Sequence, residues 1–214
     1  MTVLCLCVYG QEPVTPAAKE APATEIKGLP PRGTPADYQA RAKAGTVTLA
    51  AEFMRHAVPT PQGEFSTEDY VVVEAGLFGG PGEHSKLNIN DFSLRVNGKK
   101  PLPSRPFGMV LSSLKDPNWE PPEPAGGKEK SGGISTGGGG GQDSGPPPPP
   151  PHMPLPLQRI MEQKVQKAAL PEGDRALPVA GLLFFQYRGK GDRIASVELV
   201  YSGPAGKAAL TLQP

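Results

Sequence analysis

The chain has 214 residues and a formal net charge of +1, from 22 basic and 21 acidic side chains. This length accommodates one domain with additional chain. The near-neutral charge argues against a nucleic-acid-binding protein, which normally carries a basic face or stripe. With 27 glycines and 28 prolines, the composition approaches that of low-complexity sequence. We therefore expect that part of the chain forms no packed core.

The first ten residues contain a short apolar run, residues 2–9. The run is too short to span a bilayer, but it resembles the end of a signal-peptide core. Val8 and Gly10 are small enough for a signal-peptidase site after Gly10. We therefore predict a truncated signal peptide over residues 1–10 and an extracytoplasmic location, secreted or periplasmic. A buried first strand and a lipid anchor at Cys7 are the alternatives.

The segment that follows the leader is rich in proline, and we predict that residues 11–35 are disordered. Residues 37–44 are predicted to form a short helix. In this prediction Pro35 lies in the first turn and Gly45 ends the helix.

Alternation of apolar and polar side chains with a period of two predicts strands over residues 46–54, 69–78 and 91–96. Asn97 and Gly98 follow the third strand, and this dipeptide is the strongest short hairpin signal because both residues accept a positive φ.

The returning strand of that hairpin contains Pro101 and Pro103. Because proline donates no backbone hydrogen bond, we expect this strand to lie at a sheet edge.

A long insert, residues 115–156, is predicted to be disordered. It contains five consecutive glycines, 137–141, and six consecutive prolines, 146–151. Pentaglycine is a flexible hinge, and hexaproline favours a stiff polyproline II rod. Such an insertion costs little free energy because loop-closure entropy grows only as the logarithm of loop length.

After the insert, residues 157–170 are predicted to form an amphipathic helix. Its apolar stripe consists of Leu157, Ile160, Met161, Val165 and Ala168. Alternation then returns within residues 181–212, which predicts the closing strands.

Neither strand-bearing segment has enough apolar residues for a stable core alone. We therefore predict one interrupted domain, residues 36–114 and 157–214. The fold class is mainly β: an immunoglobulin-like antiparallel β-sandwich with one or two short helices and a long disordered Gly/Pro insert.

The strand motifs TVTLAAEF, EDYVVVEA and INDFSLRVNG, with the closing GLLFFQY and SVELVY, resemble those of bacterial exported immunoglobulin-like domains of unknown function. The resemblance covers about half of the chain. It implies an extracytoplasmic location and no defined reaction.

The three histidines, His56, His84 and His152, do not have metal-ligand spacing. Glu83 and His84 could join Asp91 at a cation site, but the favoured interpretation is that each histidine is an ordinary surface residue.

No Gly-x-Ser-x-Gly motif occurs, and the glycine run lacks the Gly-Lys-Ser/Thr ending of a phosphate loop. Glu68 and Asp69 would point to opposite faces of a strand. We therefore predict no catalytic, cofactor or metal-binding residues.

Three residues are candidates for contact with a partner: Trp119, Pro146 and Pro151. Packing of Trp119 over a sheet edge is the favoured alternative, and the proline run is favoured as a spacer over a segment that docks on an aromatic groove. The sequence favours a non-enzymatic binding or structural module whose partner is a protein or cell-envelope component. We expect no nucleic acid and no integral membrane span. The alternatives are a hydrolase with an unrecognised site and a scaffold that acts through its Gly/Pro segment.

Overall fold

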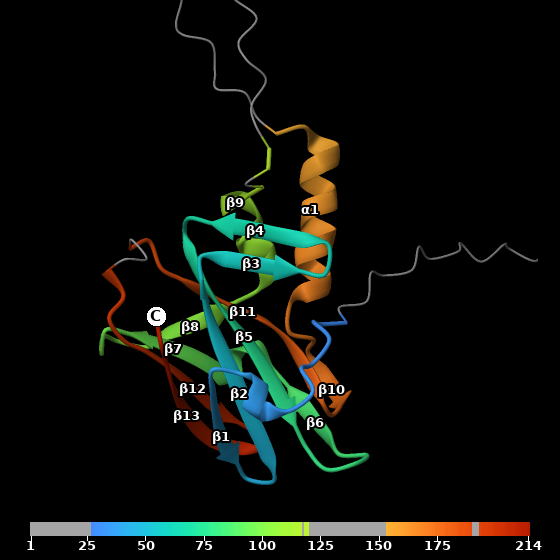
Figure 1. The fold of residues 1–214 in the computed structure, drawn as a ribbon, viewed down its shortest axis with the longest axis vertical. Helices are drawn as coiled ribbons and strands as arrows, with labels where there is room; N and C mark the ends of the chain where they lie inside the picture. The colour runs from blue at the N-terminus through green and yellow to red at the C-terminus, as the bar shows by residue number, and fades with distance from the viewer. Residues whose placement is uncertain (1–26, 117, 120–152, 190–192) are drawn as a thin grey trace, which may run out of the picture.

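The computed structural model describes residues 27–116, 118–119, 153–189 and 193–214 (Figure 1). The predicted leader, residues 1–10, and the glycine and proline runs lie outside the described residues. No helix in the described ranges is long and apolar enough to cross a membrane.

The main sheet contains eight strands in the order β1-β2-β5-β11-β8-β7-β12-β13, and each neighbouring pair is antiparallel. This confirms the predicted mainly β, antiparallel fold. The strand bounds are β1 Ala40–Ala44, β2 Val47–Arg55, β5 Tyr70–Phe78, β7 Phe92–Val96, β8 Leu102–Arg105, β11 Val179–Gln186, β12 Val197–Gly203 and β13 Gly206–Leu212.

Strand β11 lies in the interior of this sheet, although it comes from the part of the chain after the insert. It pairs with β5 from Val179 opposite Leu77 to Gln186 opposite Tyr70. On its other edge it pairs with β8, where Phe184 lies opposite Arg105. The strands after the insert therefore complete the sheet begun before it.

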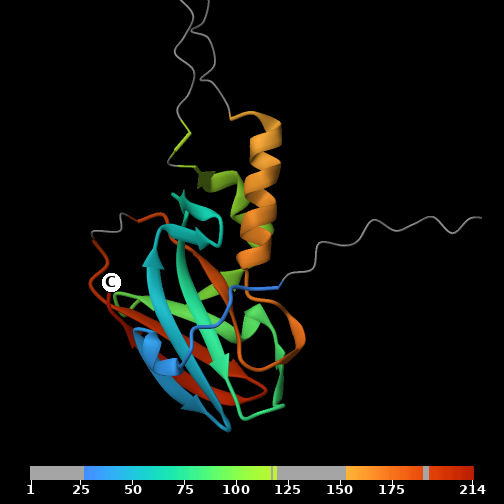
Figure 2. The same cartoon turned by 45° about the vertical axis from the view of Figure 1, so that its right-hand side comes forward.

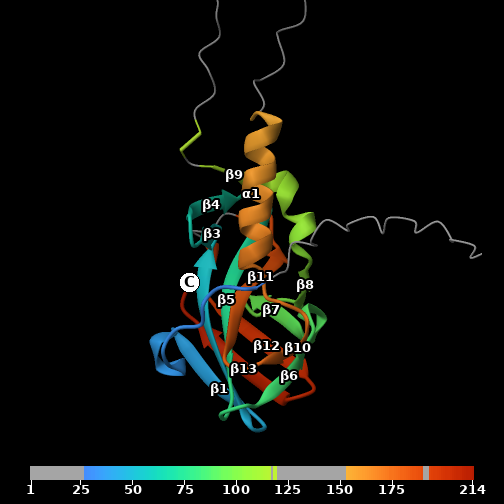
Figure 3. The ribbon, with the colours of Figure 1, turned by 90° about the vertical axis from the view of Figure 1, so that its right-hand side faces the viewer.

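The sheet curls so that its first and last strands approach each other, as in a barrel (Figure 3). Gln39, just before β1, donates a side-chain hydrogen bond of 3.0 Å to the carbonyl of Gln213, just after β13. At the other end of β1, a Cβ on Gly45 would lie 2.3 Å from the carbonyl oxygen of Ala205, so only glycine fits this approach. The eight strands thus form one curled sheet, and the immunoglobulin-like arrangement of two facing sheets is not confirmed.

Two apolar cores lie on opposite faces of β5 and β11. The inner core, inside the curl, includes Val73, Leu77 and Phe185. The outer core includes Val72 and Phe184. Because alternate side chains of both strands enter different cores, these strands are buried on both faces.

A layer of short elements covers the outer core (Figure 2). It consists of the β3–β4 hairpin, the short strand β9, two 3₁₀ turns and helix α1, and Figure 1 shows α1 extending beyond the hairpin. The bounds are β3 Ala57–Thr60, β4 Gly63–Thr67, η3 Phe107–Met109, η4 Leu111–Ser113, β9 Leu114–Lys115 and α1 Leu155–Ala168. The remaining elements are η1 Pro35–Asp37, η2 Ile89–Asp91, and the paired strands β6 His84–Leu87 and β10 Gly173–Ala176.

Helix α1 confirms the predicted amphipathic helix but starts two residues earlier and ends at Ala168. It ends there because the next residues join the sheet: Leu170 donates its backbone N–H to the carbonyl of Leu182 at 3.0 Å. Met161, Val165 and Ala168 of the predicted stripe are buried, whereas Leu157 and Ile160 are exposed.

The predicted helix over residues 37–44 is wrong. Residues 40–44 form β1, which pairs with β2 from Ala40 opposite Ala51 to Ala44 opposite Val47. The helix propensity of this alanine-rich stretch is worth only tenths of a kcal/mol per residue, so pairing with a buried strand overrides it.

The folded part of the chain also starts earlier than residue 36. Leu29, within the segment predicted to be disordered, forms an antiparallel bridge with Ala180 of β11. Residues 27–37, which we call the N-terminal strap, therefore cross the outer face of the sheet.

The Asn97-Gly98 turn has positive φ at both residues, 52° and 66°, as predicted. The returning strand β8, however, lies between β7 and β11 and not at an edge. Its prolines are tolerated because the pairing is short: β7 pairs with Leu102 and Pro103, whereas β11 pairs with Ser104 and Arg105.

We predict that a chain ending at Lys115 will not fold cooperatively. Without β11, strands β5 and β8 lose their shared neighbour and Phe185 leaves the inner core. Near-ultraviolet circular dichroism and urea unfolding should show no cooperative transition.

The matched control removes residues 132–151 from the full chain and should retain a wild-type transition midpoint. Cooperative unfolding of the truncated chain would contradict the prediction.

Candidate functional site

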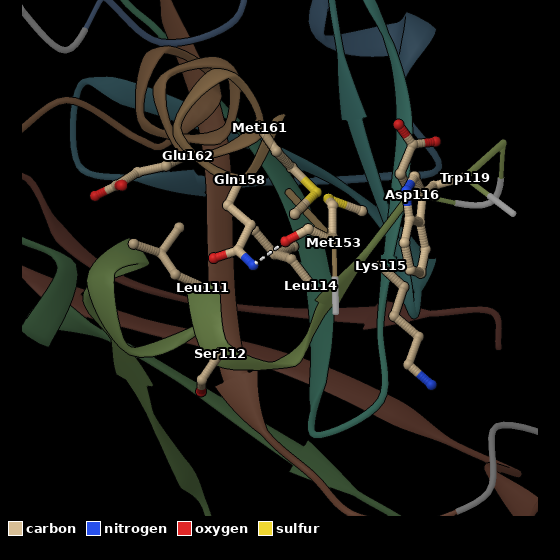
Figure 4. Close-up of a pocket in the computed structure, with 10 residues that line it drawn as sticks. All are labelled: Leu111, Ser112, Leu114, Lys115, Asp116, Trp119, Met153, Gln158, Met161 and Glu162. Carbon is tan, nitrogen blue, oxygen red and sulfur yellow. Dashed lines mark hydrogen bonds between the residues drawn. The ribbon is translucent and has the colours of Figure 1, made fainter. Parts of the chain in front are cut away.

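The candidate site is a groove between α1 and the segment from η4 to Trp119, with a volume of about 570 Å³ (Figure 4). Its apolar lining comes from Leu111, Leu114, Met153, Met161 and Trp119. Polar side chains stand at its rim: Ser112, Lys115, Asp116, Gln158 and Glu162. We call this the α1 groove.

The floor of the α1 groove continues the outer core. Met161 and Leu114 belong to that core and are 6% and 9% exposed, and Leu111 and Met153 pack against it. The groove is therefore a place where the apolar interior opens to solvent, which is typical of a binding surface.

Local hydrogen bonds fix both walls. The Asp116 carboxylate accepts from the Asn118 backbone N–H at 2.9 Å, and the Asp116 carbonyl accepts from the Trp119 N–H at 3.1 Å. This Asx turn positions the indole. On the opposite wall, Gln158 donates its side-chain amide to the carbonyl of Met153 at 2.7 Å (Figure 4).

Of the three predicted contact residues, Trp119 lines the α1 groove, whereas Pro146 and Pro151 lie outside the described residues. The sequence did not indicate the groove itself, because its walls come from both sides of the insert. The one sequence feature that pointed towards the groove was the apolar stripe of the predicted helix, because Met161 belongs to it.

A second cluster joins the N-terminal strap to the sheet. Glu52 and Glu74 lie directly opposite each other on β2 and β5, and Arg32 forms ion pairs with both, at 2.7 Å to Glu74. The Arg32 guanidinium also lies 4.5 Å from the centre of the Tyr38 ring. Although burial lowers the pKa of Arg32, hydrogen bonds and charge attraction from Glu74 and Glu52 more than offset this and raise it. Two adjacent carboxylates resemble an acid/base pair, but both are bound to Arg32, so we assign the cluster a structural role.

The residues considered for a cation site do not converge. His84 Nδ1 lies 3.6 Å from Asp174, and Asp91 lies near Tyr201, beside a glycine of β12. No group of three or more His, Cys, Asp or Glu side chains suited to a metal occurs within the residues that the structure describes.

The adjacent acids lie between β4 and β5, not within a strand, and they have different partners: Glu68 pairs with Lys115 and Asp69 with Arg188. The His56 Nδ1 atom lies 2.8 Å from the carbonyl oxygen of Tyr70, and His152 is outside the described residues.

Comparison with known proteins finds no matching family model, no matching curated protein and no matching solved structure. The resemblance to exported immunoglobulin-like domains therefore remains a prediction.

We predict that Arg32→Met lowers the free energy of unfolding by about 2 kcal/mol, because the Glu74 carboxylate is left nearly buried beside Glu52. Adding Glu74→Gln should restore part of the loss, since it removes the uncompensated charge. Urea unfolding measures both.

The matched control is Arg95→Met, which breaks an exposed pair with Glu198 and should cost less than about 1 kcal/mol. Equal losses in Arg32→Met and Arg95→Met would contradict a structural role for the strap cluster.

The Glu83 carboxylate accepts hydrogen bonds from the Thr46 hydroxyl at 2.6 Å and the Gly80 N–H at 2.7 Å, and these lower its pKa. The resulting stability is full above the unfolded-state pKa of roughly 4.3 and is lost as the pH falls through the lower folded-state pKa. We predict that Glu83→Gln lowers the melting temperature at pH 7 and that the difference shrinks towards pH 3.

Glu64→Gln, on the exposed part of β4, serves as the control and should change the melting temperature little at either pH. A Glu83→Gln deficit that does not change with pH would be evidence against the ionised carboxylate as its source.

Proposed function

We propose that this chain is a non-enzymatic extracytoplasmic binding module that captures an apolar peptide segment of a protein partner in the α1 groove. The observation that carries the proposal is the groove itself: a cavity of about 570 Å³ whose floor is the outer core and whose wall carries Trp119. The extracytoplasmic location rests on residues 1–10 as a leader.

The chemistry of the groove favours a peptide anchor over a small polar substrate. Two methionines and two leucines form most of its apolar lining, and methionine adapts to side chains of different shape. Trp119 offers a large apolar face with one hydrogen-bond donor, a combination enriched at protein interfaces.

The rim carries charges of both signs, which favours a partner whose apolar anchor is flanked by polar residues. Lys115 is already paired with Glu68 at 2.5 Å. Asp116 and Glu162 stand on the two walls of the groove. A basic residue next to the anchor would therefore meet a carboxylate on either side.

We predict that peptides selected from a displayed library on the full chain will contain an apolar anchor and will shift the emission of Trp119 to shorter wavelength. Trp119 is the single tryptophan of the sequence, so the shift reports directly on the groove. Leu111→Glu should weaken binding at least about tenfold, because the partner would have to bury a charge.

Ala209→Glu places the same charge on the exposed face of β13 and should leave both affinity and emission shift unchanged. Melting temperatures of both variants check that the fold is retained. Equal weakening by the two variants, or binding without an emission shift, would place the contact elsewhere.

Deleting residues 132–151 separates this proposal from a scaffold that acts through its Gly/Pro segment. Binding that survives the deletion supports the groove, and binding that disappears with the deleted residues supports the scaffold.

A further inference from the structure

Helix α1 presents a second surface, on the side away from the groove. The helix extends beyond the β3–β4 hairpin at one end of the molecule (Figures 1 and 3). In this N-terminal half, Leu155, Leu157 and Ile160 are 67%, 44% and 49% exposed. Three large apolar side chains are thus in water on a projecting element.

Two lysines continue this surface along the helix. Leu157, Ile160, Lys164 and Lys167 are spaced by three, four and three residues, so they lie along one face. We call these four residues the α1 stripe. Lys164 Nζ lies 5.7 Å from the centre of the Phe65 ring, which holds the side chain against the body of the protein.

The charge of this face is positive. Lys164 and Lys167 carry the charge of the stripe, whereas Arg159 projects from a neighbouring face of the helix and Glu162 lines the groove. Among the ion pairs within the described residues, none involves Arg159, Lys164 or Lys167. Neither lysine of the stripe is therefore neutralised by a carboxylate there, and Lys167 is exposed.

The order of side chains along the helix axis matches the profile of a bilayer surface. The apolar residues lie towards the projecting end, and Lys167 lies seven residues behind Ile160, roughly 10 Å along the helix. If the projecting end enters a membrane surface, the apolar side chains reach the acyl boundary and the lysines remain at the level of the headgroups.

A second copy of the chain fits the stripe poorly. Parallel pairing of two α1 helices would place lysine against lysine, and antiparallel pairing would place Leu157 against Lys167. An acidic protein surface would satisfy the lysines but would leave the apolar projecting end unpaired. A bilayer satisfies both halves of the stripe.

We propose that the α1 stripe docks the protein on the surface of an anionic lipid bilayer. The apolar end supplies burial and the lysines supply attraction to acidic headgroups. With few apolar side chains, the docking is peripheral and reversible. The groove opens on a different face of the helix.

The test is co-sedimentation of the full chain with vesicles of phosphatidylcholine containing 30% phosphatidylglycerol, in about 0.1 M salt. Wild-type protein should bind these vesicles and should not bind pure phosphatidylcholine. Lys164→Glu with Lys167→Glu should reduce the partition coefficient by roughly tenfold or more, and Leu157→Ser with Ile160→Ser should also reduce it severalfold.

The matched control is Lys99→Glu with Lys100→Glu, the same change of charge at exposed positions after the β7 turn. It should retain wild-type binding within about twofold, and melting temperatures check the fold of all variants. Equal losses in the stripe and control variants would overturn the proposal, as would wild-type binding that does not depend on phosphatidylglycerol. Binding to polyglutamate through the stripe without binding to vesicles would identify a protein-binding surface and would likewise overturn it.

Discussion

The fold depends on the backbone pairing of β11 with β5 on one edge and with β8 on the other. A central strand has all its backbone groups satisfied only when both neighbours are present. Here the neighbours come from before the insert and the strand from after it. The inner core has the same dependence, because Phe185 of β11 packs in it with Val73 and Leu77 of β5. Sheet and core therefore form together, from segments that are distant in sequence.

The alternation of apolar and polar residues predicted the strands that have one buried face and one more exposed face. β2 and β7 bury alternate residues, so a period of two located both. The strand β5 was found too, but both of its faces are buried, and alternation cannot reveal what covers the second face. That cover is tertiary: α1 and the β3–β4 hairpin over Val72, and the N-terminal strap over Glu74.

The errors have a common physical cause. The segment at 40–44 was predicted as a helix from local propensity, and β8 was predicted at an edge from its prolines. In both cases a partner strand decided the outcome: β2 pairs with β1, and β11 needs only two residues of β8. The α1 groove was missed for the same reason, because Leu114 and Met161 become neighbours only after β11 brings the two parts of the chain together. Trp119 was chosen as a contact candidate from its side chain alone, and the structure places it in the lining of the groove.

Because there are two separate cores, different parts of the molecule can unfold locally at different free-energy costs. Helix α1 contributes to the outer core and not to the inner one. It can therefore detach without disturbing the hydrogen bonds between β7 and β12. Native-state hydrogen exchange of α1 amides would then proceed through a smaller fluctuation than that of β12 amides. Helix α1 also forms a wall of the groove. A bound peptide would therefore slow hydrogen exchange of the α1 amides and leave the exchange of the curled-sheet amides unchanged.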